Sequence, residues 1–383
     1  MEHSSKITIS KSAYQKNLEL IKGFHGEESS LSSVVKGNAY GHGINVFVPM
    51  AEECGVNHFS VFNAHEAKRV YESRKKDSEI MIMGHVPADQ LSWVIDREIQ
   101  FFVSDLHRLK KLIPLVYDLN VTARIHLEVE TGMNRTGLSR KDLPEAIGLI
   151  KANSHNIEIE GICTHFAGAE SIANHVRVQN QIKSFRKLKN YLDQNEIRAA
   201  KAHAACSAAM IRYPKTCFDM VRVGILQYGF WPSQEIMIHY LQSKRNQEDP
   251  LERLITWKSE VMSIKEVKVN QFVGYGTSYL TDAPKVLATI PVGYAYGYSR
   301  SLSNQSRVIV NGHYAPVAGI INMNLLTVDI SHIPGVEVGD EAILVGNQED
   351  KEIPVSSFSD ISNQLNYELL TRIPADIPRT IIP

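Results

Sequence analysis

Short apolar runs alternate with amphipathic, charge-bearing stretches from residue 10 to about residue 242. The runs that we expect to form strands are 31–35, 58–62, 80–85, 99–103, 123–130, 157–166, 200–207 and 220–225. The clearest stretches between them, expected as helices, are 64–73, 106–117, 143–152, 176–194 and 208–213. Eight strand–helix alternations are typical of a (β/α)8 barrel, whose functional groups gather at the carboxyl ends of the strands. The sequence therefore predicts an α/β protein with a TIM-type barrel over residues 11–242.

The pattern changes after residue 231. A polar, charged stretch at 241–254 is typical of a linker. Strand-like runs with turn residues between them follow at 256–267, 286–292, 307–310, 315–321, 325–330 and 341–345. We expect a separate, mainly β domain of sandwich or barrel type over residues 243–383. The N-terminal residues 1–10 contain an alternating run, 7–10, which we expect to pair with that domain.

Composition excludes several classes of partner. The formal net charge of −1 gives no electrostatic reason to expect nucleic acid or an anionic membrane surface. No apolar run approaches the length of a membrane span, and the polar N-terminus lacks the apolar core of a signal peptide. Cys54, Cys163, Cys206 and Cys217 are scattered without metal-ligand spacing. We therefore expect free thiols, no metal site and a cytoplasmic protein.

A single lysine, Lys36, ends the first predicted barrel strand. It follows two valines and precedes a glycine-rich turn, in the order Val-Val-Lys-Gly-Asn-Ala-Tyr-Gly-His-Gly. A lysine in that place loses solvation, which makes its neutral amine easier to reach. A neutral amine is what imine formation with a carbonyl cofactor requires. A surface lysine at a strand end fits this stretch equally well when it is taken alone.

The strand predicted at 123–130 has one polar face, formed by His126, Glu128 and Glu130. Period-two geometry places the apolar side chains of this strand on the opposite face, toward the helices. A barrel interior has little reason to hold three polar groups unless a site lies there. Arg135 follows in the next loop. A self-satisfied cluster of charges at the barrel mouth is the alternative.

The last three predicted strands end in residues that suit a phosphate and a ring. His165 closes the sixth strand, although a lone histidine there is more often a packing residue. Ser207, Gly224 and Ile225 follow the seventh and eighth strands, where barrels commonly hold a phosphate. Arg222 lies one residue inward from this turn, so we expect it beneath whatever ring carries that phosphate. A rim arginine paired with a carboxylate is as plausible for Arg222 alone.

Together, the lysine, the phosphate cradle, the histidine and the arginine describe a site for pyridoxal 5′-phosphate. Residues 35–43 closely resemble the cofactor-lysine motif of the alanine racemase family, which usually has alanine where Gly37 stands. Further matches to that family occur in family order at 131–135, 164–166, 220–225, 273–276 and 291–295. They cover nearly the whole chain, both predicted domains included.

The resemblance implies a head-to-tail homodimer in which each site is completed by the partner's β-domain. Lys36 would bind the cofactor aldehyde, and the phosphate would be held by Tyr40, Ser207, Gly224 and Ile225. His165 would lie against the ring, and Arg222 would face the pyridine nitrogen. Arg135 would contact the cofactor's phenolic oxygen and the substrate carboxylate. Tyr275 and the backbone of Met323 would come from the other subunit.

The implied reaction interconverts L- and D-alanine, supplying D-alanine for peptidoglycan. Racemisation removes the α-proton from one face and returns a proton to the other, so two bases must flank the α-carbon. Lys36 would serve one face and Tyr275 the other. A turn aromatic that packs locally is the alternative for Tyr275. An arginine at the pyridine nitrogen, here Arg222, leaves that nitrogen unprotonated and weakens the electron sink, which limits transamination.

The chain departs from the family at several positions. Glu128 stands where many relatives carry a carbamylated lysine, and we expect its carboxylate to brace Arg135 directly. At the substrate entrance, Ile320, Asn324 and Tyr296 stand where the family usually has charged residues, and Ala375 stands where it has a tyrosine. Cys206 replaces a usual asparagine. Two readings remain open: a racemase of broader specificity, or an entrance in which Arg372 or Asp376 fills the gap.

Two other functions share parts of this pattern. A fold-related decarboxylase would have the barrel, the lysine and the β-domain, but with an acidic residue at the pyridine nitrogen. A cofactor-binding homeostasis protein would resemble the barrel alone. Arg222 and Tyr275 argue against the first, and the whole second domain argues against the other.

Overall fold

This computed structural model describes residues 3–242, 244, 247–355 and 366–383. The chain forms two compact units: residues 13–36 with 47–252, and residues 1–12 with 37–46 and 253–383. The boundary expected between residues 242 and 243 falls at the edge of the described residues. No described helix is long and apolar enough to cross a membrane. None of the four cysteines, all of which lie in the described residues, forms a disulfide.

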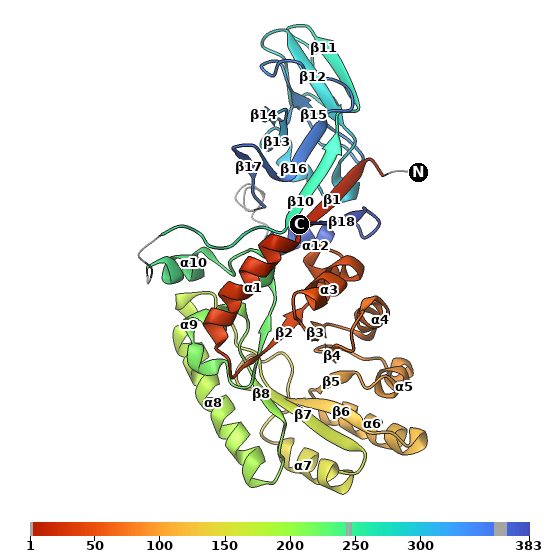
Figure 1. Cartoon of the computed structure of the whole chain (residues 1–383), viewed down its shortest axis with the longest axis vertical. Coiled ribbons are helices and arrows are strands. Elements are labelled where there is room, and N and C mark those ends of the chain that lie inside the picture. The colour runs from red at the N-terminus through yellow and green to blue at the C-terminus, as the bar shows by residue number, and fades with distance from the viewer. Residues whose placement is uncertain (1–2, 243, 245–246, 356–365) are drawn as a thin grey trace. The chain divides into compact units, whose positions relative to one another are not determined.

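An eight-stranded sheet with parallel pairing lies at the centre of the first unit (Figure 1). In the order of the sheet its strands are β8 (Lys201–His203), β7 (Ile157–Cys163), β6 (Ala123–Glu128), β5 (Gln100–Val103), β4 (Glu79–Ile82), β3 (His58–Val61), β2 (Ser30–Val34) and β9 (Met220–Val223). A bridge between Cys206 and Arg222 joins the last strand back to the segment after β8, so the sheet closes. The predicted barrel is confirmed.

The helices of this unit alternate with its strands along the chain, beginning with α1 (Lys11–His25), which precedes β2. The others are α3 (Ile44–Glu53), α4 (Ala64–Ser73), α5 (Ala88–Asp96), α6 (Leu106–Leu119), α7 (Leu143–Ala152), α8 (His175–Gln194), α9 (Ser207–Arg212) and α10 (Gln234–Leu241). Side-chain caps begin three of them, one being Ser233, whose hydroxyl accepts from the backbone N–H of Ile236 before α10. Asn63 accepts from the backbone N–H of Glu66 before α4, and Asp105 accepts from that of Arg108 before α6. Such caps satisfy N–H groups that a helix start leaves without a partner.

The second unit contains two sheets. The seven-stranded sheet has β17 (Lys351–Ile353) on one side of β16 and otherwise the order β14 (His313–Pro316), β13 (Arg307–Val310), β16 (Glu341–Gln348), β10 (Ile255–Glu260), β1 (Ser5–Ser10) and β18 (Arg379–Ile382). The three-stranded sheet consists of β11 (Ser263–Val267), β12 (Lys285–Ile290) and β15 (Leu326–Asp329). Helix α12 (Asn366–Arg372) precedes β18. The N-terminal strand β1 therefore pairs with strands of the C-terminal part, antiparallel to β10 and parallel to β18.

The single strand predicted at 256–267 is two strands in different sheets. The N–H of Val261 donates to Asp340, whereas the N–H of Met262 donates to Thr289. The chain thus passes from one sheet to the other between these two residues, and a continuous β-rich sequence hides that crossing. The strand predicted at 315–321 ends at Pro316, since the chain turns at Gly319, where φ is +87°.

Candidate active site

The backbone after Lys36 adopts an unusual left-handed turn. The segment α2 (Lys36–Tyr40) has φ values of 62°, 55° and 53° at Gly37, Asn38 and Ala39, and φ is 50° at Tyr40. Each non-glycine residue in this conformation costs about 1–2 kcal/mol. The carbonyl of Asn38 accepts from Gly43 at 2.8 Å, which helps to close the turn. Strain of this kind persists only where the surrounding structure imposes it, and it concentrates at functional sites.

Lys36 lies at the carboxyl end of β2, where part of its side chain remains exposed while the surrounding atoms desolvate its amine. Burial is the main cause that lowers the pKa of its amine, and the guanidinium groups of Arg135 and Arg222 lower it further. Glu66 and Cys206 act in the opposite direction without restoring the ordinary value. The structure thus brings together Lys36, Arg135, Arg222 and Cys206, four of the predicted site residues. A lysine in this environment presents a neutral amine closer to neutral pH than an exposed lysine does.

Arg222 is buried inside the barrel and is fixed by acceptors. Its Nη1 donates to Nδ1 of His203 and to the carbonyl of the same residue, the latter at 3.1 Å. Its Nη2 donates to the carbonyl of Thr164 at 2.7 Å. Among the described residues no carboxylate forms an ion pair with Arg222. The alternative of a rim arginine held by a carboxylate is therefore not supported.

His165 lies at the same rim, close to three cations. Burial, and then the charges of Arg222, Arg135 and Lys36, lower the pKa of His165 to about 3. Its imidazole is therefore neutral over the whole physiological range. The amide of Gln181 donates to the His165 carbonyl at 3.0 Å and fixes the backbone there. The result is a neutral aromatic ring beside two guanidinium groups and an amine.

The carboxylate of Glu128 is buried beside the same cations. Burial raises the pKa of Glu128, while a hydrogen bond from Thr136 and the charges of Arg222 and Arg135 act against that rise. No ion pair within 4.0 Å joins Glu128 to Arg135 in the described part of the chain, so the two interact through charge at longer range. Bracing of Arg135 by Glu128 stays a prediction.

The third predicted polar residue of this strand, Glu130, does something else. Its carboxylate accepts three backbone N–H groups of the following loop, those of Gly132, Met133 and Asn134, the last two at 2.8 and 2.9 Å. Glu130 therefore holds the loop that leads to Arg135 and does not face the interior. The hydroxyl of Thr131, the first residue of this loop, contacts the hydroxyl of Thr164 at 2.8 Å, and this contact fixes the start of the loop.

Two short helices begin side by side after β8 and β9. Ser207 is the first residue of α9, and Ile225 is the first of the 3-10 helix η3 (Ile225–Tyr228). The N–H of Gly224 donates to the Ser207 hydroxyl at 3.1 Å, which connects the two starts. Neither start has a side-chain cap, because Cys206 and Gly224 occupy the capping positions. Backbone N–H groups at helix starts bind anions, so this donor set suits a phosphate.

The other predicted phosphate contact, Tyr40, belongs to the second unit. There its ring packs edge-on against Tyr367, with centroids 5.9 Å apart. Tyr275 and Met323 lie in the same unit and are 74% and 55% exposed. The exposure of Tyr275 does not support the alternative of an aromatic that packs locally. The N–H of Ala295 donates to the Met323 carbonyl at 2.9 Å and ties the two loops of this region together.

The altered entrance residues also lie in the second unit. Asn324 and Ala375 are exposed, and Ile320 is half-buried. The ring of Tyr296 packs edge-on against His3 at 5.6 Å. Arg372 forms an ion pair with Glu368 in its own helix. This pairing gives no support to the idea that Arg372 replaces a missing entrance charge.

Sequence reasoning missed three polar residues of the barrel: His58 and Gln100, which are buried, and Glu79, which is half-buried. All three join the hydrogen-bonded chain that reaches Arg222 through His203. The available signal was their position, because each is the first residue of a mainly apolar strand.

Comparison with known proteins identifies the family. Residues 9–232 match the model described as alanine racemase, N-terminal domain, and residues 254–381 match alanine racemase, C-terminal domain. Alanine racemase 1 of Clostridium acetobutylicum is 34% identical over 360 residues, which cover 93% of this chain and 90% of that protein.

Two solved structures extend the match to the fold. The crystal structure of alanine racemase from Bacillus anthracis with bound L-Ala-P has a TM-score of 0.89 and 28% identity, covering 100% of this chain and 96% of that one. That of alanine racemase from Bartonella henselae with covalently bound pyridoxal phosphate has a TM-score of 0.83 and 26% identity, covering 99% of both chains. The resemblance inferred from the motifs is thus confirmed, and the chain belongs to the alanine racemase family.

Proposed function

We propose that this protein is a pyridoxal phosphate-dependent racemase that interconverts L- and D-alanine. The observation that carries the proposal is Lys36, an amine of lowered pKa beside Arg135 and Arg222 at the carboxyl end of β2, in a chain of the alanine racemase family. D-alanine for peptidoglycan is the product that this activity would supply, in the cytoplasm.

The residues present fit the cofactor. Lys36 offers an amine for an aldehyde, and the uncapped starts at Ser207 and Ile225, with Gly224, offer N–H donors for a phosphate. Arg222 offers a fixed buried cation for a ring nitrogen, and Tyr40 is the fourth phosphate contact that we propose. Pyridoxal phosphate, when bound, supplies a carbonyl that condenses with amines and a ring that delocalises electrons from the substrate α-carbon.

The protein's own residues then manage binding and protons. Arg135 binds the substrate carboxylate, and the Lys36 amine Nζ takes or returns the proton at one face of the α-carbon. The phenol oxygen of the partner subunit's Tyr275 does so at the opposite face. The two bases must lie on opposite sides, because a proton removed and returned on one side regenerates the same enantiomer. His165, neutral beside the cations, packs against the cofactor ring without competing for protons.

A homodimer follows from this division of labour. Met323 of the partner subunit would contribute its backbone beside Tyr275. Exposed large apolar side chains are frequent in the second unit and support an interface there: Met262, Val269, Phe272, Tyr275, Leu280, Tyr294, Met323 and Val338 are all more than one-third exposed. Exposed apolar surface on this scale commonly marks a protein–protein contact.

The substrate entrance supports a second candidate function, with substrates larger than alanine. Ile320 and Asn324 carry no charge where relatives have charged residues, and a Cβ added at Gly276, next to Tyr275, would lie 3.5 Å from the Ile320 side chain. An uncharged entrance would admit amino acids with side chains larger than methyl. A broad-specificity racemase of the same family is therefore the second candidate.

The test is a chiral assay of the cofactor-loaded dimer over a panel of L-amino acids. We expect L-alanine to give an equimolar mixture with D-alanine, because enantiomers have equal free energies, and to have the highest kcat/KM of the panel. Arginine, lysine or methionine matching alanine would assign the broader activity. Release of carbon dioxide without inversion would indicate a decarboxylase, and inertness toward every amino acid would revive the homeostasis protein.

A further inference from the structure

A chain of buried hydrogen bonds runs through the barrel interior from Arg222 to the opposite end of the sheet. Arg222 donates to Nδ1 of His203, and Nε2 of His203 lies 2.8 Å from Nδ1 of His126. Nε2 of His126 lies 2.8 Å from Oε1 of Gln100, whose Nε2 donates to Oε1 of Glu79 at 3.0 Å. His203, His126 and Gln100 are at most 1% exposed.

The two ends of the chain fix the direction of every bond between them. An arginine side chain can only donate, and an ionised carboxylate can only accept. Nδ1 of His203 must therefore be the acceptor, so its proton is on Nε2 and is donated to His126. By the same step His126 carries its proton on Nε2 and donates it to the Gln100 carbonyl. The amide of Gln100 must then point its nitrogen at Glu79, as the structure shows.

A side branch supports this order. Nε2 of His58 lies 3.4 Å from the same Gln100 carbonyl, and Nδ1 of His58 lies 2.9 Å from the Ser32 hydroxyl. Two imidazoles, those of His58 and His126, thus contact the Gln100 side-chain oxygen. Both contacts fix which way the Gln100 amide group is oriented. Burial is the main cause that holds the pKa of His126 and of His203 well below the ordinary value, so both rings are neutral.

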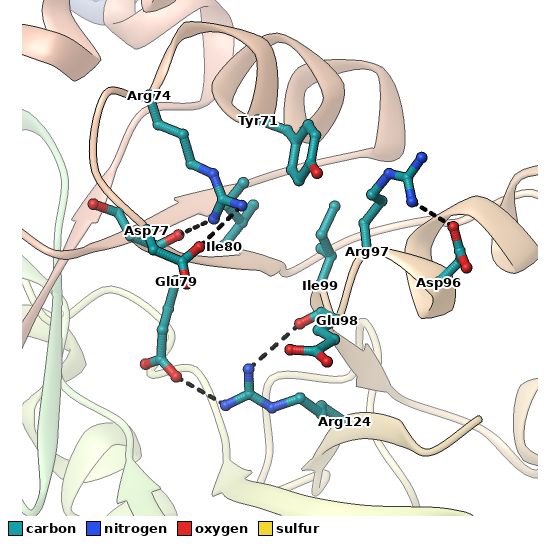
Figure 2. A pocket seen from close by; sticks show the side chains of 11 residues that line it. Tyr71, Arg74, Asp77, Glu79, Ile80, Asp96, Arg97, Glu98, Ile99 and Arg124 are labelled. Carbon is teal, nitrogen blue, oxygen red and sulfur yellow. Dashed lines mark hydrogen bonds and ion pairs between the residues drawn. The ribbon is translucent and has the colours of Figure 1, made fainter.

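Glu79 is anchored as an anion at the far end. Figure 2 shows its carboxylate and the Arg124 guanidinium pointing toward each other, at 2.8 Å, in a charged pocket. The Lys201 amine lies 3.6 Å from the other oxygen. Burial alone would raise the pKa of Glu79, but the hydrogen bond from Arg124 and the neighbouring positive charges outweigh it and lower that pKa. Arg124 is held in turn by Glu160 at 2.5 Å.

We propose that Glu79, Gln100 and His126 are positioning residues for Arg222, because they lock His203 in the tautomer whose Nδ1 accepts from the guanidinium. Losing the Gln100 carbonyl would leave the Nε2–H of His126 without its acceptor in a dry interior. The pair could satisfy that proton only by shifting both rings to the Nδ1–H tautomer. That shift sets a donor of His203 against a donor of Arg222 and displaces the guanidinium.

The direct test is the tautomer state of the histidines, read by 15N NMR of the holoenzyme labelled at histidine. Protonated and unprotonated imidazole nitrogens resonate far apart, and a His203→Gln spectrum assigns the signals. We expect both His203 and His126 in the Nε2–H form in the native protein. In Gln100→Leu we expect loss of this single form for both rings. A native His203 with its proton on Nδ1, or an unchanged spectrum in Gln100→Leu, would overturn the proposal.

A kinetic test covers the consequence for Arg222, and this arm alone rests on the proposed racemase activity. An unsatisfied buried donor is equivalent to about a tenfold change in rate, so we expect Gln100→Leu to lower kcat about tenfold with little change in KM for alanine. In Gln100→Glu the new carboxyl group shares one proton with the carboxylate of Glu79. It can therefore still accept from His126 and donate to Glu79, so this variant should recover most of kcat and the native tautomers.

Thr216→Val is the matched control, because it removes a buried hydroxyl bonded to the Tyr213 carbonyl at 2.7 Å outside this chain of bonds. It should leave both tautomers unchanged. Equal kcat losses in Thr216→Val and Gln100→Leu, or no recovery in Gln100→Glu, would show a merely structural role. A wholly inactive native protein would refute the racemase proposal and leave the NMR test intact.

Discussion

The buried histidines of the barrel should make the protein unusually sensitive to mild acid. Burial is the main cause that lowers the pKa of His58 to about 4 and that of His165 to about 3. It also holds the pKa of His126 and of His203 well below the ordinary value. Each of these rings stays neutral in the folded state at a pH where a histidine of an unfolded chain, with a pKa of about 6.5, becomes charged.

The sign and size follow from proton linkage. Between the folded and unfolded pKa values the unfolded state binds more protons, so the free energy of unfolding decreases as the pH falls. For one such histidine the loss between about pH 7.5 and about pH 5.5 is about 1 kcal/mol, so the four barrel histidines together lose several kcal/mol. His42 of the second unit, whose pKa burial lowers to about 4, adds a loss of the same sign. Burial raises the pKa of Glu128, so its carboxyl group binds up to one proton more in the folded state and offsets at most one histidine's share of the loss. The loss is a large part of an ordinary domain's stability.

The assay is urea unfolding of the cofactor-free chain at the two pH values, followed by far-UV circular dichroism. His58→Gln should reduce the pH-dependent loss by about 1 kcal/mol, because one of these proton sites is gone. His155→Gln, at an exposed site on the same unit, is the matched control and should leave the difference unchanged. A total loss smaller than that of a single histidine would refute the reasoning.

The remaining predictions concern the charge beside the active-site cations, the turn after Lys36, and assembly. Glu128→Gln should lower kcat/KM at least tenfold, because the guanidinium groups lose a buried counter-charge, and a fully active variant would remove the bracing hypothesis. Gly41→Ala should cost more than about 3 kcal/mol of stability in urea unfolding, since φ is +82° and the new Cβ would lie 2.0 Å from the Leu370 carbonyl oxygen. Gly335→Ala, with φ of +69° and nothing within 4 Å, should cost only about 1 kcal/mol, and equal losses would contradict the packing argument. Analytical ultracentrifugation should give twice the 43.0 kDa of one chain, and a monomer retaining full activity would exclude a shared site.

Most of the fold could be predicted because its strands are plain in the sequence. Parallel strands buried on both faces are continuous apolar runs, such as Phe101, Phe102 and Val103 in β5. The inward polar face of β6 was also predictable, and His126 and Glu128 are both buried. Family motifs then supplied roles that no periodicity could give.

What the sequence could not show depends on tertiary structure. Asparagine adopts left-handed backbone readily, as at Asn38, but nothing local favours it at Ala39 and Tyr40, where the packed surroundings impose it. Gln100 is a single polar residue before an apolar run, and its importance comes from partners that arrive from other strands. The alternation of the strand placed Glu130 on the polar face with His126 and Glu128. Its carboxylate instead accepts from backbone N–H groups of the following loop, which the alternation could not show.

The central claim, that two bases act on opposite faces of one α-carbon, is tested most directly by α-deuterium exchange in D2O with chiral analysis of the product. The native dimer should place deuterium at the α-carbon of both enantiomers and invert them. Tyr275→Phe should exchange the α-proton of one enantiomer while leaving its configuration unchanged, because only Lys36 remains. Inversion at the native rate by Tyr275→Phe, or native-rate exchange of both enantiomers by Lys36→Ala, would contradict the account.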